Sequence, residues 1–203
     1  MPKRDSSHMA ARRKQILDAA SASIQEKGVA GLSISDISGS AGLSVGAIYT
    51  HFKSKEEILA SLITQDNGVG NADLFKDCPT IDATLHRLTA LLQQVQNDGE
   101  ATLKGHIAIQ VVVLAHRSEL VHNAIELQYR GLRDAVMAQV ALLQAASAQQ
   151  ANQKLAAMVG ECLLGLMLSV QFQRLAGITP DTEAKILAAK NLLELLQASP
   201  LKP

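Results

Sequence analysis

Residues 28–57 carry a dense series of signals for ending and starting helices. Gly28 follows a stretch of apolar residues at helical spacing, as a glycine does at a helix C-terminus. Ser33 begins the sequence Ser-Ile-Ser-Asp, which has the spacing of a capping box. Gly42 can adopt the left-handed conformation that ends a helix, and Ser44 can cap the next one. The segment therefore predicts short helices joined by tight turns.

The rest of the chain predicts further helices and no strands. Aromatic residues make up 2% of the chain and Trp is absent, so the core must consist of Leu, Ile, Val, Ala and Met, a composition that favours helix. We expect an all-α fold of about nine helices, the last starting at Thr179-Pro180. These helices are expected at about residues 10–27, 33–41, 44–51, 54–63, 81–97, 101–116, 119–147, 151–176 and 181–198.

The apolar residues of the segment 33–55 are spaced so that two short helices would face each other and the first helix. These residues are Ile34, Ile37, Ala41, Leu43, Ile48 and Phe52. Two helices that pack in this way across Gly42 form a helix-turn-helix. The second helix then exposes a first turn of small residues, which lets it approach the floor of a DNA major groove.

Polar groups around the second helix can bind the DNA backbone. Tyr49, His51 and Lys55 could donate hydrogen bonds to phosphates, helped by the hydroxyls of Ser33 and Ser44. The predicted DNA-binding residues are Ser33, Ser44, Val45, Gly46, Ala47, Tyr49, Thr50, His51 and Lys55.

Charge is distributed unevenly although the whole chain is neutral. Residues 1–55 carry eight Lys and Arg against four Asp and Glu, a net charge of +4, so residues 56–203 carry −4. A basic end on an acidic body is expected when one small domain binds phosphates. The basic run Arg12-Arg13-Lys14 could extend that interface, or it could be a solvated helix face.

The order of these features closely resembles the TetR family of transcriptional repressors over about residues 12–63. The resemblance rests on a helix ending at Gly28, then Ile34-x-x-Ile37, Ala41-Gly42-Leu43-Ser44 and Ile48-Tyr49-x-His51-Phe52-x-x-Lys55-Glu56. It implies a nine-helix protein that dimerises through its last two helices. It also implies a ligand in the C-terminal domain that moves the paired DNA-binding domains out of register.

The resemblance also implies a role for individual residues. Tyr49, His51 and Lys55 match the family's phosphate contacts, Ser33 and Ser44 its helix-start contacts, and Val45, Ala47 and Thr50 positions near base edges. Gly46 is common in the family. The predicted recognition helix has no Arg, Lys, Asn or Gln for a bidentate base contact. We therefore expect readout through Thr50, thymine methyl groups, the Lys3–Lys14 arm and DNA shape.

We expect a DNA-binding domain at residues 9–53 and a helical ligand-binding and dimerisation domain at residues 54–203. Candidate cavity walls in the second domain mix apolar and polar side chains. Glu161 is a lone carboxylate in an apolar stretch, so it either lines the cavity or pairs with Arg130, Arg133 or the partner subunit. The candidate ligand-binding residues are His106, Gln110, Leu114, Gln128 and Glu161.

The helices at 151–176 and 181–198 offer more apolar surface than one core needs, which favours a homodimer built through them. Packing inside one core is the competing explanation. The expected partners are double-stranded DNA, a second copy of the chain and an unidentified small molecule.

Other functional classes lack support in the sequence. Cys78 and Cys162 are too few for a disulfide framework, and the second is expected to be a buried, inert thiol. The histidines lack metal-site spacing, and no nucleophile–base pair or phosphate loop is present, so we expect no cofactor, no metal and no enzyme. The start of the chain is polar, and the most apolar run, residues 155–170, is shorter than the roughly 20 residues a bilayer needs. We expect a cytoplasmic protein with no membrane segment. A protein-interaction module, an activator, or a regulator without a small-molecule effector stay open as alternatives.

Overall fold

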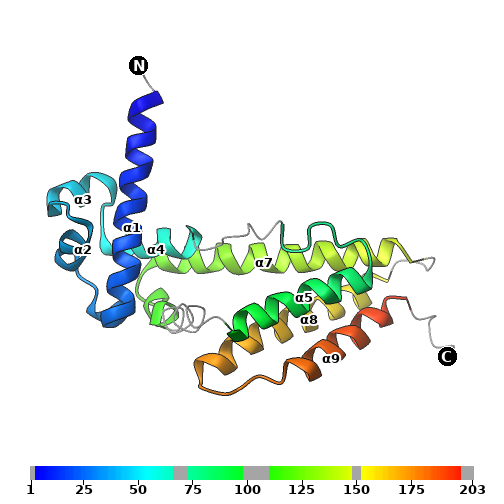
Figure 1. Ribbon diagram of the computed structural model, residues 1–203. Helices are drawn as coiled ribbons and strands as arrows, with labels where there is room; N and C mark the ends of the chain where they lie inside the picture. Colours follow the sequence, from blue (N-terminus) through cyan, green and yellow to red (C-terminus); the bar gives the residue numbers. More distant parts are fainter. Residues whose placement is uncertain (1–2, 66–72, 98–109, 148–151, 198–203) are drawn as a thin grey trace. The chain divides into compact units, whose positions relative to one another are not determined.

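The computed structural model describes residues 3–65, 73–97, 110–147 and 152–197, in which all regular secondary structure is helical (Figure 1). The expected all-α fold is confirmed. Of the helix expected at 101–116, residues 101–109 lie outside the described residues, and residues 110–115 are helical. The helices are α1 (Lys3–Gly31), α2 (Ile34–Ala41), α3 (Val45–His51), α4 (Lys55–Gln65), α5 (Ile81–Asn97), α7 (Glu119–Ala145), α8 (Gln153–Leu175) and α9 (Thr182–Leu195).

The chain divides into two compact units. The first comprises residues 1–68 and 106–128, and the second comprises residues 69–105 and 129–203. Helix α4 and the start of α7 therefore belong with the N-terminal residues. The functional division into a DNA-binding domain and a ligand-binding domain stays a prediction.

The first unit has a core to which α1, α2, α3 and α4 all contribute. Ile37, Ile48 and Phe52 are at most 1% exposed, and Ile34 and Leu43 pack against them half-buried, as their spacing predicted. The later segments add Val111 and Val121, both buried, to the same core. Residues far from the N-terminus in sequence thus complete the N-terminal unit.

Helix α1 is interrupted at Gly28, where the sequence predicted its end. Gly28 has φ +73° and ψ 169°, a conformation that side chains disfavour, and one more turn follows to Gly31. The break frees the backbone N–H of Val29, which donates to Gln110 Oε1 at 2.7 Å. A Cβ on Gly28 would lie 3.0 Å from that same oxygen, so the close approach also requires glycine.

In the second unit, α5, α8 and α9 run side by side, and residues 129–145 of α7 belong to the same unit (Figure 1). The predicted start of the last helix is wrong. Pro180 lies outside α9, because Asp181 is the N-cap and accepts a hydrogen bond from Ala184 N at 2.9 Å. The buried core consists of Leu88, Val136, Val140, Leu143, Val159, Leu163, Leu164, Ala189, Leu193 and Leu196.

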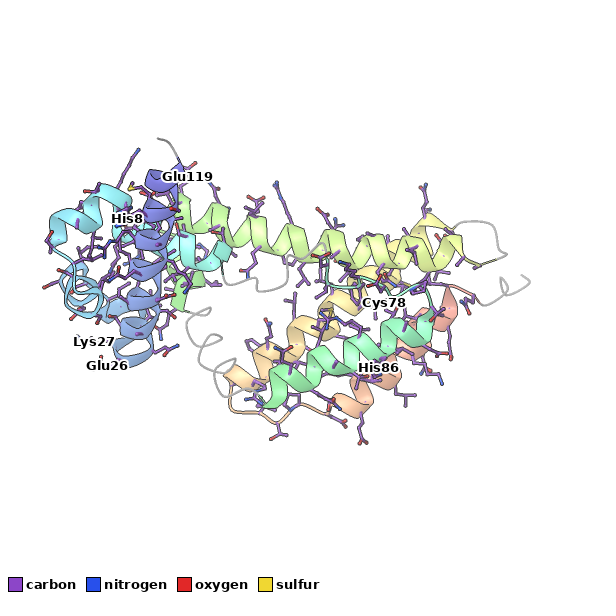
Figure 2. The ribbon with its side chains drawn as sticks, turned by 45° about the horizontal axis from the view of Figure 1, so that its top comes forward. His8, Glu26, Lys27, Cys78, His86 and Glu119 are labelled. Carbon is purple, nitrogen blue, oxygen red and sulfur yellow. The ribbon has the colours of Figure 1, made fainter. Side chains whose placement is uncertain are left out.

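A buried polar group joins the segment before α5 to α7. The side-chain amide of Gln139 donates to Cys78 O and to Thr84 Oγ1, each at 2.7 Å. Cys78 is buried beside this amide, within the second unit (Figure 2). Cys162 is exposed, so the expectation that it is a buried thiol is wrong. Cys162 lies on the face of α8 that points away from the core.

Helix α8 is longer than the sequence suggested. By length and composition, its stretch Gln153–Arg174 of 22 residues suffices to cross a membrane, which corrects the estimate from residues 155–170. Only 28% of its most apolar window is buried. In the second unit, Val159, Leu163 and Leu164 of this helix lie in the core against α5 and α9. The helix therefore has one face in the core and another that the unit leaves uncovered.

Candidate nucleic-acid interface

Side chains cap both helices of the segment 33–52 as the sequence predicted. Ser33 Oγ accepts from Asp36 N, and Ser44 Oγ accepts from Ala47 N, each at 3.1 Å. Gly42 ends α2 in the left-handed conformation with φ 62° and ψ 32°. The two helices therefore meet across a short turn and form a helix-turn-helix.

The outer face of α3 is exposed and takes no part in the core of the first unit. Val45 and Tyr49 are 42% and 52% exposed, and Gly46 is exposed between them. A Cβ on Gly46 would find only Ser44 Oγ, 4.0 Å away. Glycine lowers helix stability by about 1 kcal/mol relative to alanine. No contact among the described residues of this unit requires a glycine at position 46.

The polar residues at the end of α3 and the start of α4 differ in how far their polar atoms are already bonded within the protein. Thr50 Oγ1 donates to Gly46 O at 3.0 Å, so its hydroxyl proton is already used within the helix. His51 is half-buried, and among the described residues its buried Nδ1 has no hydrogen-bond partner. Lys55 Nζ donates to Leu32 O at 3.2 Å. Tyr49 is the most exposed of the three expected phosphate contacts.

The basic run at residues 12–14 is engaged with the protein. Lys14 pairs with Asp18 at 2.7 Å on the surface of α1. Arg12 donates to Gln15 Oε1 at 2.8 Å. Arg13 reaches furthest, because its guanidinium donates to His51 O at 2.6 Å.

An ion pair joins the end of α1 to the first turn of α2. Lys27 Nζ lies 2.5 Å from Asp36 Oδ1, and Figure 2 shows Lys27 at the end of α1 remote from His8. The hydrogen bond from Lys27 lowers the pKa of the Asp36 carboxyl, and the Ser33 hydroxyl lowers it further. The same bond raises the pKa of Lys27. The pair thus fixes where α2 begins relative to α1.

Comparison with known proteins agrees with this geometry. The sequence model of the family described as "Bacterial regulatory proteins, tetR family" matches residues 16–62, which span α1 to α4. The chain is therefore similar to TetR-family regulatory proteins over residues 16–62. The HTH-type transcriptional repressor Rv1474c of Mycobacterium tuberculosis is 38% identical over 66 residues. That alignment covers 32% of this chain and spans about a third, 35%, of the relative.

Solved structures of low sequence identity share the fold along nearly the whole chain. A transcriptional regulator from Rhodococcus sp. Rha1 has a TM-score of 0.66 at 18% identity, covering 94% of this chain and 99% of its own. The multidrug binding protein EbrR complexed with proflavin has a TM-score of 0.63 at 18% identity, covering 89% and 99%. The reduced form of E. coli NemR has a TM-score of 0.71 at 17% identity, covering 90% and 97%. These likenesses show the fold.

The residues expected to bind a ligand do not share one unit. His106 lies outside the described residues. Gln110, Leu114 and Gln128 belong to the first unit, where Gln110 contacts the end of α1 and Leu114 packs on the core. Glu161 belongs to the second unit, where it is exposed and accepts from Arg133 Nε at 2.9 Å. Pairing with Arg133 was an expected alternative to a cavity position for Glu161, and the structure contains this ion pair.

The described part of the second unit contains an open groove between α5 and α9. Its volume is about 320 Å³, and its floor is apolar. Of the expected ligand-binding residues, the four that the structure describes do not line it. The lining residues are Thr89, Leu92, Gln93, Thr182, Glu183, Ile186, Leu187 and Lys190. Within the described residues, no group of three or more His, Cys, Asp and Glu side chains is placed to hold a metal ion.

The two helices expected to form a dimer interface use their apolar residues differently. In α9, Ala189, Leu193 and Leu196 face the core of their own unit, which was the competing explanation. In α8, an apolar stripe at helical spacing stays exposed. This α8 stripe consists of Met158, Cys162, Gly165, Leu168 and Phe172.

Proposed function

We propose that this chain is a homodimeric repressor that acts in the cytoplasm. It binds a palindromic operator through α2 and α3, and a small molecule bound in its C-terminal domain releases it. The observation that carries the proposal is the first turn of α3. That turn is capped by Ser44, fully formed, and presents Val45 and Gly46 to solvent without any contact inside the unit that requires glycine.

The geometry divides the DNA contacts into two kinds. Val45, Gly46 and Ala47 form the turn that approaches the bases, while Tyr49 donates its hydroxyl to a phosphate. Ser33 and Ser44 cap helices whose free N-terminal amides point at the backbone. Thr50 presents its methyl group and oxygen lone pairs, and His51 and Lys55 contribute at the edge of the interface.

Dimerisation is supported by the uncovered α8 stripe. Phe172 is 64% exposed on a helix otherwise apolar enough to cross a membrane, a surface that a monomer rarely leaves in water. A second copy would cover it and would place two recognition helices on one operator. Two half-sites bound together multiply a weak single-site affinity.

A small-molecule effector is supported by a protein of the same fold. The structure of EbrR is that of a multidrug binding protein with proflavin bound. In this chain the groove between α5 and α9 offers an apolar floor with a few polar groups, the composition of a small-molecule site.

DNA binding is tested first by fluorescence anisotropy on the DNA upstream of the gene for this chain, against a scrambled duplex, across a salt series. We expect tighter binding to the upstream duplex, with two or four chains per site. Tyr49→Ala should weaken binding, whereas Tyr129→Ala, which removes the other exposed tyrosine from the second unit, should not. An intact dimer that binds neither duplex at low salt would refute the proposal and favour a protein-interaction module.

The dimer is tested by sedimentation velocity on Phe172→Glu. A charge within a dimer interface should weaken self-association by at least about 100-fold. Leu142→Glu, at another exposed apolar position in the same unit, should leave the dimer intact. Equal behaviour of the two variants would refute the α8 interface.

A further inference from the structure

The guanidinium of Arg13 joins three helices of the first unit. From its place in α1, its Nη1 donates to His51 O at 2.6 Å and its Nη2 to Ser61 Oγ in α4 at 3.3 Å. Its Cζ lies 4.1 Å from the centroid of the Phe52 ring, close enough for a cation–π interaction. The guanidinium of Arg13 thus contacts three groups of the first unit.

His51 is the last residue of the recognition helix α3. The final carbonyls of a helix have no intrahelical donor and carry partial negative charge, so a cation that donates to one of them stabilises that end. Phe52, which follows, is 1% exposed and anchors α3 in the core. Arg13 therefore contacts the C-terminal end of α3 at two places, the backbone carbonyl of His51 and the ring of Phe52.

Gln15, two residues further along α1, makes the equivalent contact with α2. Its Nε2 donates to the carbonyl of Ala41, the last residue of α2, at 2.7 Å. The orientation of the amide is set by Arg12, which donates to Gln15 Oε1 at 2.8 Å. Helix α1 thus supplies one donor to the carbonyl end of each helix in the helix-turn-helix.

We propose that Arg13 and Gln15 are positioning residues for DNA recognition. By donating to the last carbonyls of α3 and α2, they fix the orientation of these two helices relative to α1. This inference rests on the proposed DNA binding. It assigns to Arg13 a role other than the phosphate contact or solvated charge that the basic run suggested. It also separates Arg13 from Lys14, whose charge is paired on the surface of the same helix.

The geometry explains why arginine is needed. Only a planar fork can donate in two directions while its face stacks on an aromatic ring, and a lysine ammonium cannot do both. Lys at position 13 would keep the charge and lose the joint contact with α3, α4 and Phe52. Charge and geometry can therefore be separated by experiment.

The test uses a duplex recovered by the wild-type chain from a random-sequence pool. Affinity is measured across a salt series, well below the unfolding temperature, with the active fraction determined by stoichiometric titration. The variants are Arg13→Gln, Arg13→Lys and Gln15→Leu, with Lys14→Gln as the matched control that removes a neighbouring charge. Thermal unfolding of each variant is measured in parallel.

We expect Arg13→Gln, Arg13→Lys and Gln15→Leu each to raise Kd about tenfold, the effect of losing one charge-assisted or well-oriented hydrogen bond. The salt slope should stay at the wild-type value in all three, and Lys14→Gln should raise Kd by much less. Gln15→Leu carries no charge change, so it reports positioning even if Arg13→Gln fails to fold.

A direct phosphate contact gives a different pattern. Arg13→Lys would then bind as the wild type does, and Arg13→Gln would lower the salt slope by about 0.9. A purely structural role would lower the unfolding temperature and leave Kd unchanged. Either pattern overturns the inference while wild-type DNA binding still stands. If the wild-type chain recovers no duplex from the pool, the proposed function and this inference fail together.

Discussion

The helices of the first unit are held at their ends by side-chain hydrogen bonds in addition to their apolar core, whereas those of the second unit meet mainly through apolar side chains along their sides. In the first unit, Ser33, Ser44, Arg13 and Gln15 each bond to a backbone group at the end of a helix. In the second unit, α5, α8 and α9 meet mostly through Leu, Val and Ala side chains. Directional bonds specify an angle between helices, while apolar packing specifies proximity. A surface that binds DNA, as proposed for α3, depends on the angle at which that helix is held.

Loss of a core side chain in the second unit should have the largest effect. Leu193 is fully buried, so Leu193→Ala should lower the free energy of unfolding by about 2–5 kcal/mol. On the same helix, Leu187 is 60% exposed, and Leu187→Ala should change it by less than about 0.5 kcal/mol. Urea unfolding of both variants checks the pair. Similar losses in the two variants would show that α9 is not held by the side that carries Leu193.

In the first unit, the break in α1 should be the most sensitive backbone position. Gly28→Ala forces a side chain into a positive-φ conformation and towards Gln110, so it should cost about 1–3 kcal/mol. Gly39→Ala is the control, because Gly39 lies in α2 with nothing within 4 Å of its Cβ position. Thermal unfolding should move in opposite directions for the two variants. A stabilising Gly28→Ala would contradict the geometry of the break.

Gly46 should separate stability from function. Gly46→Ala should stabilise α3 by up to about 1 kcal/mol, because its Cβ meets no atom that must move. The same methyl group would sit where the helix approaches DNA, so affinity should fall by roughly tenfold. Calorimetry and anisotropy on the same preparation measure both. Gly39→Ala should be more stable than the wild type and keep its affinity for DNA. Equal affinities of the two variants would contradict a close approach of Gly46 to DNA.

The exposed Lys27–Asp36 pair should have the smallest effect, present near neutral pH and lost at extremes of pH. The pKa of Asp36 is lowered from 3.8, so its contribution is present above that value and is lost as pH falls through the lower folded-state pKa. The pKa of Lys27 is raised from 10.5, so its contribution is present below that value and is lost as pH rises through the higher folded-state pKa. Asp36→Asn should therefore approach the wild-type unfolding temperature in acid and lie below it near neutrality. If the unfolding temperatures of the wild type and of Asp36→Asn differed by the same amount at every pH, this ion pair would not contribute to stability.

Local signals made the first unit readable in advance. The caps at Ser33 and Ser44, the left-handed Gly42 and the break at Gly28 each depend on residues within four positions of one another, so their spacing alone predicts them. The buried face of the helix-turn-helix followed from periodicity in the same way. The family resemblance rested on these same local features.

The contacts missed by sequence reasoning are those between distant residues. Arg13 and His51 are 38 positions apart, and Gln110 and Val29 are 81 apart. No local spacing distinguishes a guanidinium that caps a remote helix from one that faces solvent, and Gln110 looked like a ligand contact because its helix mixes polar and apolar residues.

By itself, the sequence determined the all-α class, the helix-turn-helix and its exposed face, because capping, turn formation and helical periodicity are local. Only the tertiary structure decided which apolar helix faces are buried within the chain. It buried Ala189 and Leu193 of α9, left the α8 stripe open, and paired Glu161 with Arg133. Burial depends on which segments meet in space, and apolar helices of equal quality can meet in many ways. Periodicity shows that a face is apolar, and packing alone decides what covers it.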